Sequence, residues 1–263
     1  NIRVISTQDT DVTPWDTGAY ASRQTYTCAP AVHAAADELR RKLLAYAGEM
    51  TGQFPAALTI GPTPQGDAVV FVRSPETVLV TLRDLAMDTF YNKDRGGQLT
   101  AEASFKSRQN PPSFGCCFTE VEVDVQLCKV RIADIMNVHD AGVIINPALA
   151  TAQVHGGMGM GIGWALYEEL IIDPETGRVR NNNLLDYKFP TFCDIPDLEC
   201  AFVQTEEPSG AYGNKSLGEP PIISPAPALR NAVLDATGVA VNAIPMTPKR
   251  LFVEFVKAGL IEG

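Results

Sequence analysis

The sequence predicts an α+β fold in which mixed sheets are packed with helices. Stretches with strand-like alternation and stretches with helical spacing of apolar residues both occur, but they do not follow one another as regular β–α–β units. The 263 residues are 45% hydrophobic and 20% charged, which is a globular composition with ample apolar surface for a core. We expect one region over 1–263 that divides into two lobes, about 1–110 and 111–263.

The first lobe combines strands, helices and a long loop. Apolar residues after Pro30 recur at helical spacing, and proline is favoured at the first position of a helix. A region rich in Gly, Pro, Ser, Asn and Gln closes the lobe and indicates a linker or surface loop. In chain order we expect a strand at 2–8, a polar loop at 9–18, a helix from Pro30 to Gly48, a strand at 68–73, a short helix at 76–89 and the loop at 93–114.

The second lobe opens with strict alternation after Phe118. Polar residues at 120, 122, 124 and 126 face one way and apolar residues at 121, 123, 125 and 127 the other, which predicts a half-buried strand. Cap residues mark the last helix, with Thr247 before Pro248 at its start and Gly259 after its end. The other expected elements are a hairpin partner at Lys129–Met136, a helix through Gln153 to Leu170, strands around 184–189 and 200–205, and a helix from Pro225 to Gly238.

The charge balance narrows the classes of function. Lys and Arg number 21 and Asp and Glu number 31, so the formal net charge is −10. This argues against a general affinity for nucleic acid or for an anionic membrane, which needs clustered Lys and Arg. No stretch approaches the roughly 20 apolar residues that span a bilayer. The chain begins at Asn1 rather than Met, so we expect a processed chain or a fragment.

The six cysteines do not form a metal motif. None is part of a CxxC pair, and with only three His residues no zinc-like cluster is expected. Cys128 and Cys200 lie in apolar, strand-like sequence. We expect reduced, buried thiols in a cytoplasmic protein, with a disulfide framework as the alternative.

The segment at 16–23, Asp-Thr-Gly-Ala-Tyr-Ala-Ser-Arg, is the first candidate for chemistry. Gly18, Ala19 and Ala21 expose the backbone, Ser22 offers a hydroxyl and Arg23 offers a fork of donors. Small residues with successive amides can cradle an anionic group. A tight turn without a ligand is the alternative.

The second candidate is the glycine-rich run at 153–163. It places five glycines in eight residues between helix formers, at a cost of roughly 1 kcal/mol each relative to Ala in a helix. Either close packing against another backbone or close approach of a cofactor must offset that cost. The spacing does not match the dinucleotide fingerprint GxGxxG, so that cofactor class is excluded here. His155 lies in this run and is a candidate contact to the same ligand.

The third candidate is Gly-Asn-Lys-Ser-Leu-Gly-Glu-Pro-Pro at 213–221. Glu219 stands between Gly218 and two prolines, in an otherwise apolar setting just before a helix. A carboxylate in such a place can act as a general base, or it can simply face the helix dipole. His139 and Asp140 are neighbours on an extended segment and point in opposite directions, so we expect structural roles for them.

Together these segments resemble the molybdenum-binding subunit of the xanthine dehydrogenase and aldehyde oxidase family. The match rests on residues 16–23, on Asn-Pro at 146–147 leading into the run from Gln153, and on Lys-Ser-Leu-Gly-Glu-Pro-Pro at 215–221. It covers the whole chain, is closest to the bacterial xanthine dehydrogenase type, and implies a C-terminal portion of such a subunit, with the fold of its molybdopterin-binding domain.

The resemblance implies a molybdopterin cofactor, with its cytosine dinucleotide form as an alternative. It implies hydroxylation of a purine such as xanthine or hypoxanthine, with water as oxygen source and with Glu219 taking a proton from the molybdenum-bound hydroxyl. Electrons then pass to 2Fe-2S clusters and FAD on partner subunits or domains, and from there to NAD. No residue of this chain is expected to ligate metal. The implied cofactor-binding residues are Gly18, Ala19, Tyr20, Ala21, Ser22, Arg23, Gln153, His155, Lys215, Ser216 and Gly218.

The resemblance also implies partners and leaves alternatives. An upstream half of the molybdenum subunit should complete the site, and FAD-binding and iron–sulfur subunits should complete the enzyme, so the chain alone is not expected to be active. One alternative is the same chemistry on an aldehyde or another N-heterocycle. Another is a catalytically silent assembly module whose docking face is the acidic strand at 120–126.

Overall fold

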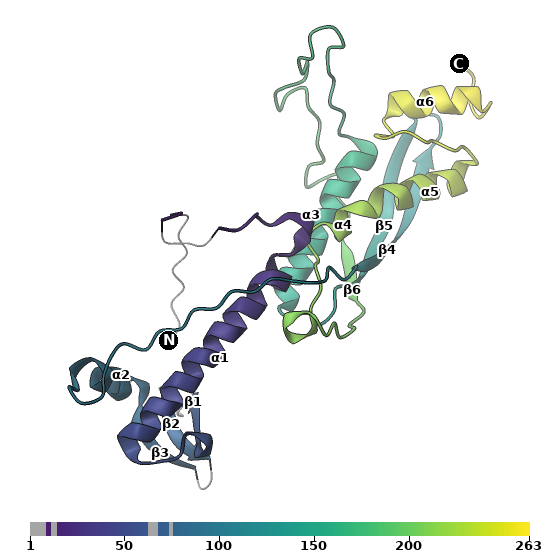
Figure 1. Cartoon of the computed structure of the whole chain (residues 1–263). Helices are drawn as coiled ribbons and strands as arrows, with labels where there is room; N and C mark the ends of the chain where they lie inside the picture. Colours follow the sequence, from purple (N-terminus) through teal and green to yellow (C-terminus); the bar gives the residue numbers. More distant parts are fainter. Residues whose placement is uncertain (1–8, 12–14, 63–67, 74–75) are drawn as a thin grey trace. The chain divides into compact units, whose positions relative to one another are not determined.

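The computed structural model describes residues 9–11, 15–62, 68–73 and 76–263, and it divides into two compact units (Figure 1). Unit 1 comprises Asn1–Tyr26 and Arg108–Gly263, and unit 2 comprises Thr27–Ser107. The boundary lies near the residue 110 expected from the sequence, but the first 26 residues group with the C-terminal part. The strand expected at 2–8 lies outside the described residues.

Unit 2 is built on a three-stranded antiparallel sheet in the order β1-β2-β3. Its strands are β1 (Leu58–Pro62), β2 (Ala68–Arg73) and β3 (Glu76–Thr81), accompanied by the long helix α1 (Gln24–Thr51) and by α2 (Leu82–Tyr91). The loop expected from residue 93 is present, since residues 92–113, all of them described, contain no helix or strand. The core of the unit consists of Tyr46, Ala47, Leu58, Val80 and Leu85.

Two expectations for unit 2 are wrong. Helix α1 begins at Gln24 and ends at Thr51, so it extends beyond Pro30 and Gly48 at both ends. A Cβ at Gly48 would lie 2.7 Å from the carbonyl oxygen of Gln53, so this glycine permits close packing and does not end the helix. Residues 76–81 form a strand because they pair with β2, and helix α2 starts only after Thr81, whose hydroxyl accepts from the amide of Asp84.

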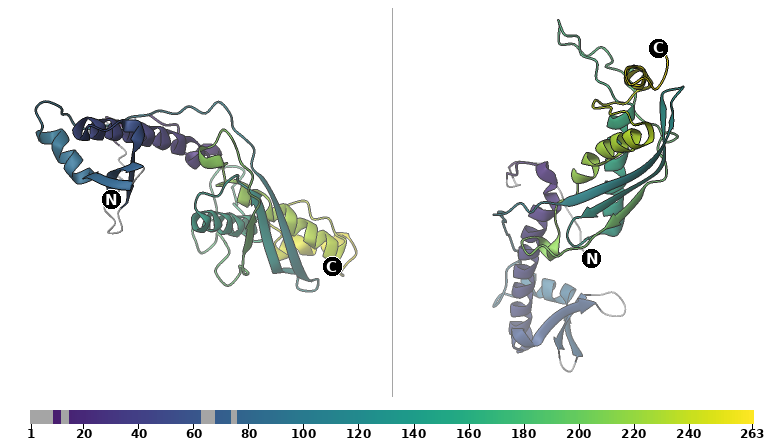
Figure 2. Two further views of the ribbon diagram at one scale, coloured as in Figure 1. Left: turned by 90° about the horizontal axis from the view of Figure 1, so that it is seen from below. Right: turned by 90° about the vertical axis from the view of Figure 1, so that its right-hand side faces the viewer.

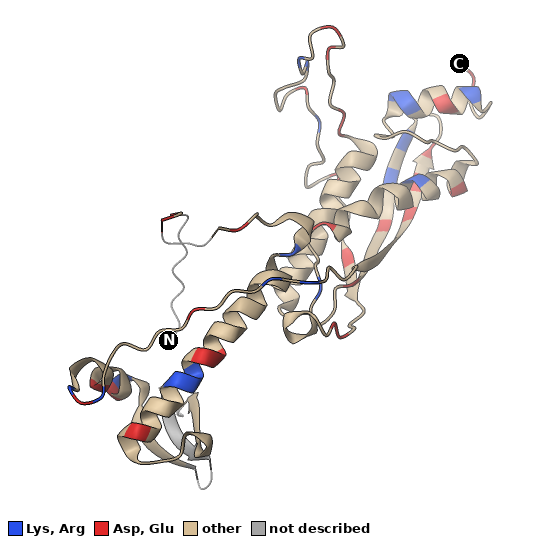
Figure 3. Cartoon of the chain, viewed as in Figure 1, with Lys and Arg blue, Asp and Glu red and all other residues tan. Residues whose placement is uncertain are grey.

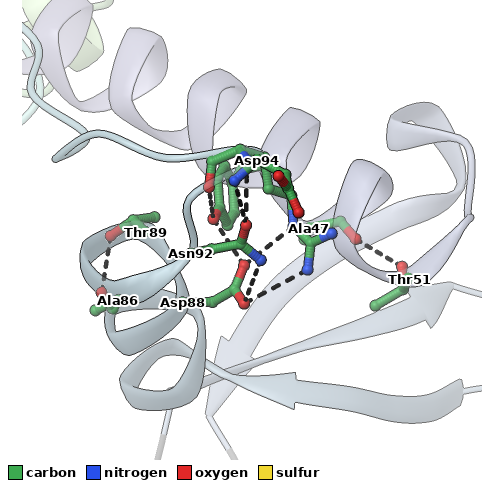
Figure 4. A network of polar contacts seen from close by, with 9 residues as sticks. Ala47, Thr51, Ala86, Asp88, Thr89, Asn92 and Asp94 are labelled. Carbon is green, nitrogen blue, oxygen red and sulfur yellow. Dashed lines mark hydrogen bonds and ion pairs between the residues drawn. The ribbon is translucent and has the colours of Figure 1, made fainter.

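A polar network ties α1 to α2 and to the loop that follows (Figure 4). The hydroxyl of Tyr46 donates to Asp88 at 2.7 Å, the Nε of Arg95 donates to the same carboxylate at 3.1 Å, and Asn92 donates to its other oxygen at 3.2 Å. The pKa of Asp88 lies below its ordinary value, because the bond from Tyr46 outweighs partial burial and Asn92 and Arg95 add to it.

Replacing Asp88 with Asn is therefore expected to lower the thermal unfolding temperature of the chain at neutral pH. A depressed folded-state pKa contributes stability above the unfolded value, and that contribution is lost as pH falls through the folded value. The difference between wild type and Asp88→Asn should be constant above about pH 5 and should shrink below about pH 4. Circular dichroism melts across this range measure it. A difference that grows in acid would contradict the assignment.

Unit 1 contains a mixed three-stranded sheet with helices on one face. Strand β4 (Phe114–Asp124) pairs antiparallel with β5 (Lys129–Asp140), and β5 pairs parallel with β6 (Glu199–Phe202). Helices α3 (Pro147–Leu166) and α5 (Pro225–Thr237) cover the sheet, with the short α4 (Pro220–Ile223) before α5 and α6 (Pro248–Lys257) at the end (Figures 1 and 2). The α+β fold with mixed sheets is confirmed.

The alternation along β4 is confirmed with one exception. Val121 and Val123 are half-buried and pack on the core, while Glu120, Glu122 and Asp124, which alternate with them, are exposed. Leu127, expected on the buried face, is 61% exposed because it lies in the turn between the two strands. The exposed face is less acidic than expected, since Arg131 pairs with Glu122 across the hairpin and Lys129 lies opposite Asp124 (Figure 3).

Helix α3 ends at Leu166 and not at Leu170. The orphan carbonyl of Ala165 accepts the amide of Met246 at 2.6 Å, and the carbonyl of Gly163 accepts the amides of both Tyr167 and Glu168. These bonds satisfy the helix end and turn the chain away. Residues 184–189 form no strand, and β6 is limited to Glu199–Phe202.

The two C-terminal helices follow the expectation. Helix α5 ends before Gly238, which adopts φ 72°. The side chain of Thr247 caps α6 by accepting from the amide of Arg250, and Gly259 adopts φ 70° just beyond the helix.

None of the six cysteines, all of which are described, is in a disulfide. Cys128 is buried as expected and Cys200 is half-buried, but Cys28, Cys116 and Cys193 are exposed. Within the described residues, no helix is long and apolar enough to cross a membrane.

Candidate functional site

A cavity of about 700 Å³ in unit 1 brings the three candidate segments together. The 3-10 turn at Tyr20–Ser22 supplies Ser22 to its lining, and Ala19 lies just before this turn. Helix α3 supplies Gln153, and the segment before α4 supplies Lys215, Gly218 and Glu219. The rest of the lining is mostly apolar with several amide and hydroxyl groups, and consists of Gln24, Thr25, Ala141, Val143, Ile144, Ile145, Asn146, Leu149, Ala150, Met160, Asn214, Leu217 and Ile222.

Ser22 and Glu219 hold one another by two hydrogen bonds. The hydroxyl of Ser22 donates to Oε2 of Glu219 at 2.9 Å, and it accepts the backbone amide of Glu219 at 2.5 Å. Ser22 reaches this position from a backbone with φ 53°, a left-handed conformation that costs a non-glycine residue free energy. The preceding Ala21 has the same φ. The surrounding structure therefore stabilises a strained turn at the point where Ser22 meets the carboxylate.

Gly218 is required by this contact. A Cβ at this position would lie 2.9 Å from the Ser22 hydroxyl, so a side chain there would push Ser22 away. The carbonyl oxygen of Gly218 accepts from Nε2 of Gln153 at 3.4 Å. Gly218 thus contacts both Gln153 of helix α3 and Ser22 of the turn.

Glu219 is exposed at this cavity, although the sequence suggested an apolar setting. Its Oε2 is occupied by Ser22, and no hydrogen bond within the described part of the chain engages Oε1. The carboxylate is therefore oriented by one oxygen and can exchange a proton at the other.

The glycines of α3 serve packing more than ligand contact. A Cβ at Gly157 would lie 2.6 Å from Cβ of Pro221, and one at Gly161 would lie 2.9 Å from Cβ of Pro225. These two glycines are one turn apart, so they form a smooth strip on which α4 and the start of α5 lie. For these two positions close packing against another segment offsets the helix cost. A Cβ at Gly156, by contrast, would meet no other described segment within 4 Å.

Lys215 is less available to a ligand than expected. Its ammonium lies 2.8 Å from Oδ2 of Asp140, and the two side chains are only 9% and 14% exposed. Burial pushes the pKa of Asp140 up, but bonds from Lys215, from the amide of Gly142 and from Thr205 outweigh it and leave the pKa below its ordinary value. The Asp140 carboxylate is therefore charged, and it is paired with the ammonium of Lys215.

The side chains of Arg23 and Tyr20 make contacts within their own loop. The guanidinium of Arg23 donates to the carbonyl of Gly18 at 2.9 Å and to Asp16 at 3.2 Å, contacts Thr17, and lies 4.4 Å above the ring of Tyr20. It thus shapes the turn that presents Ser22 and is not directed into the cavity.

The remaining predicted site residues also lie outside the cavity lining. His155 is two residues from Gln153, about 200° around the helix. Ser216 is buried, and its carbonyl accepts from the hydroxyl of Ser113. His139 is 1% exposed in β5 and burial lowers its pKa, which agrees with the structural role expected for it. The predicted residues that do not line the cavity are Gly18, Tyr20, Ala21, Arg23, His155 and Ser216.

Sequence reasoning missed the residues at the start of α3. Asn146 caps this helix by accepting from the amide of Leu149, and Asn146, Leu149 and Ala150 line the cavity. The signal was available, because Asn before Pro is a helix-start pattern. The positive end of a 20-residue helix at the cavity favours an anionic group there.

The comparison with protein families shows the family to which the chain belongs. A model of the molybdopterin cofactor-binding domain matches residues 1–196. The chain belongs to the molybdopterin cofactor-binding domain family. Within this family it is 60% identical over 261 residues to the putative xanthine dehydrogenase molybdenum-binding subunit XdhA of Escherichia coli (strain K12), covering 99% of this chain and 34% of that relative. The chain therefore spans about one third of the length of the curated relatives it matches first.

Other proteins similar to this chain have names that point to varied substrates. The probable hypoxanthine oxidase XdhD of Escherichia coli (strain K12) is 31% identical over 98% of the chain and 26% of its own length. Among solved structures, CO dehydrogenase from Oligotropha carboxidovorans superposes with a TM-score of 0.81 at 26% identity, over 95% of this chain and 31% of that one. Quinoline 2-oxidoreductase from Pseudomonas putida 86 gives 0.76 at 26% identity, over 93% and 31%.

The cavity of this family member fits a molybdopterin. Its volume is within the range of cofactor sites, and amide and hydroxyl donors converge on it beside the helix start. Within the described residues, no three His, Cys, Asp or Glu side chains gather as a metal-binding group.

Proposed function

We propose that this chain is part of a molybdenum hydroxylase that oxidises xanthine or hypoxanthine with water as the oxygen source. The observation that carries the proposal is the Ser22–Glu219 contact at the cavity, because it places one oriented carboxylate at the site of a molybdopterin-family domain. The purine substrate class is supported by the 60% identity to a putative xanthine dehydrogenase subunit.

In this proposal Glu219 is the general base. Ser22 keeps Oε2 occupied, so Glu219 takes a proton at Oε1 from the oxygen that is transferred to the substrate. Ser22 orients the carboxylate but does not exchange the proton. The molybdenum cofactor, when bound, supplies the redox chemistry that accepts two electrons from the substrate.

The cofactor is held by backbone and amide groups and not by net positive charge. We assign Gln153, Asn146 and Gly218, which line the cavity, to contacts with the pterin. Ala19 and Ser22 also line the cavity. Gly18, Tyr20, Ala21 and Arg23 support that turn from outside the cavity, while His155 and Ser216 remain candidates for contacts with groups outside this chain.

The complete enzyme contains more than this chain. We propose that the rest of the molybdenum subunit closes the cavity, and that 2Fe-2S and FAD subunits carry electrons to NAD in the cytoplasm. The substrate class has a second candidate within the family, since an aldehyde oxidoreductase subunit of Escherichia coli (strain K12) is 36% identical over 62% of the chain. The silent assembly module has less support, because basic residues of β5 neutralise part of the acidic strand.

Turnover of the complete enzyme in ¹⁸O-labelled water tests this function. We expect xanthine or hypoxanthine to be oxidised faster than nicotinate or an aromatic aldehyde, with one labelled oxygen entering the product. Molybdenum analysis of the same preparation should show the metal. Preferred turnover of an aldehyde would move the assignment to the second candidate. A metal-loaded complex without hydroxylation of any member of the panel would overturn the proposal.

A further inference from the structure

The buried ion pair of Asp140 and Lys215 joins segments that are far apart in sequence. Asp140 is the last residue of β5, and Lys215 lies four residues before Glu219. The carboxylate accepts three bonds, from the Lys215 ammonium at 2.8 Å, from the Thr205 hydroxyl at 2.7 Å and from the Gly142 amide at 3.0 Å. Both oxygens are used, so the carboxylate is held in one orientation.

Backbone bonds align the same two segments. The amide of Lys215 donates to the carbonyl of Ala141 at 2.8 Å, and the amide of Val143 donates to the carbonyl of Gly213 at 2.8 Å. Together with the ion pair they form a short antiparallel bridge centred on Gly142 and Asn214. The bridge has no room for a larger residue, since a Cβ at Gly142 would lie 2.3 Å from the carbonyl oxygen of Gly213.

Beyond Lys215 the chain is held more sparsely until Glu219. The carbonyl of Ser216 accepts from Ser113, and the carbonyl of Gly218 accepts a long bond from Gln153. The bridge therefore fixes the chain before Glu219, while Pro221, whose carbonyl accepts from Asn137 at 3.1 Å, is held just after it. The ammonium also lies 5.4 Å above the ring of Phe114, so its environment is closed by protein groups.

We propose that Asp140 and Lys215 act as a positioning clamp, which sets the register of residues 213–219 so that Glu219 meets Ser22 at the cavity. Lys215 lines the cavity, but its ammonium is paired with Asp140, so we assign the pair to positioning. This inference rests on the proposed function for the role of Glu219, but the register itself is a property of this chain. It differs from the sequence expectation, in which Lys215 binds the cofactor directly.

The register is tested in this chain without cofactor, by hydrogen–deuterium exchange. In Asp140→Asn, amides of the peptide covering 213–219 should exchange faster by roughly tenfold or more, because removing one partner leaves the other buried and unpaired. Asp173→Asn is the matched control. Like Asp140, Asp173 accepts from a basic side chain and from backbone amides, but it lies away from the cavity. Unchanged exchange at 213–219 in Asp140→Asn would overturn the clamp.

A second variant protects the test against loss of folding. Asp140→Asn combined with Lys215→Met removes both charges and leaves neither buried alone. It should fold and still show faster exchange at 213–219 than wild type. Exchange equal to wild type in this double variant would also overturn the clamp.

The consequence for chemistry is tested in the complete enzyme. Asp140→Asn should lower kcat by roughly 10- to 100-fold with KM and molybdenum content near wild type, because a misplaced base affects the chemical step. Lys215→Arg keeps the charge and should recover part of the loss. Loss of molybdenum in Lys215→Met with normal exchange at 213–219 would instead assign Lys215 to the cofactor. If Glu219→Gln retains turnover in parallel, the proposed role of Glu219 as general base fails, while the exchange result still decides the clamp.

Discussion

Replacing Glu219 with Gln in the complete enzyme is expected to lower kcat by roughly 10²- to 10⁴-fold, the range that general base catalysis contributes. Glutamine keeps the size of the side chain and can still accept from the Ser22 hydroxyl. It cannot take a proton at the position of Oε1. The loss should therefore appear in kcat, with little change in KM and with molybdenum retained.

The control for this result is a carboxylate of the same unit away from the cavity. Glu199→Gln at the exposed start of β6 should leave turnover near wild type. The turnover of Ser22→Ala should lie between those of Glu219→Gln and Glu199→Gln, because this substitution releases the Glu219 carboxylate without removing it. Near-normal turnover of Glu219→Gln would remove Glu219 from the mechanism, and molybdenum loss in that variant would make it a cofactor-binding residue instead.

Replacing Gly157 with Ala should destabilise the chain by about 1–3 kcal/mol, the usual cost of overpacking. The new methyl group would lie 2.6 Å from Cβ of Pro221 and 3.0 Å from its carbonyl carbon. Neither group is the end of a flexible side chain, so helices α3 and α4 must separate. Since Pro221 is two residues from Glu219, the same substitution should also disturb the candidate base.

Gly156→Ala is the matched control on the same helix. Its new methyl group would have no described neighbour within 4 Å, so the substitution should stabilise the chain by up to about 1 kcal/mol through helix propensity. Urea denaturation followed by circular dichroism measures both variants. Equal stabilisation by both substitutions would show that α3 and α4 are not in close contact. Close approach of a cofactor would then be the better explanation for a glycine at position 157.

Local patterns predicted the elements that depend on neighbouring residues. The alternation at 121–125 specifies a half-buried strand because its period matches the pleat, and Thr247 and Gly259 mark their helix because cap geometry involves a few residues only. Where pairing decided the outcome, local patterns failed. Residues 76–81 precede a segment of good helix formers, so a helix was expected over 76–89. They form a strand because β2 offers them backbone partners.

Residue patterns were enough to pick out the three segments that resemble the family, and to pick out Glu219 as the candidate general base. Only the tertiary structure decided which side chains share the cavity. It turned Arg23 inward on its own loop, paired Lys215 with Asp140 and placed His155 outside the lining. It also brought Ser22 to Glu219 across 197 residues. The physical reason is that periodicity and caps are local, whereas these contacts depend on how distant segments pack against one another.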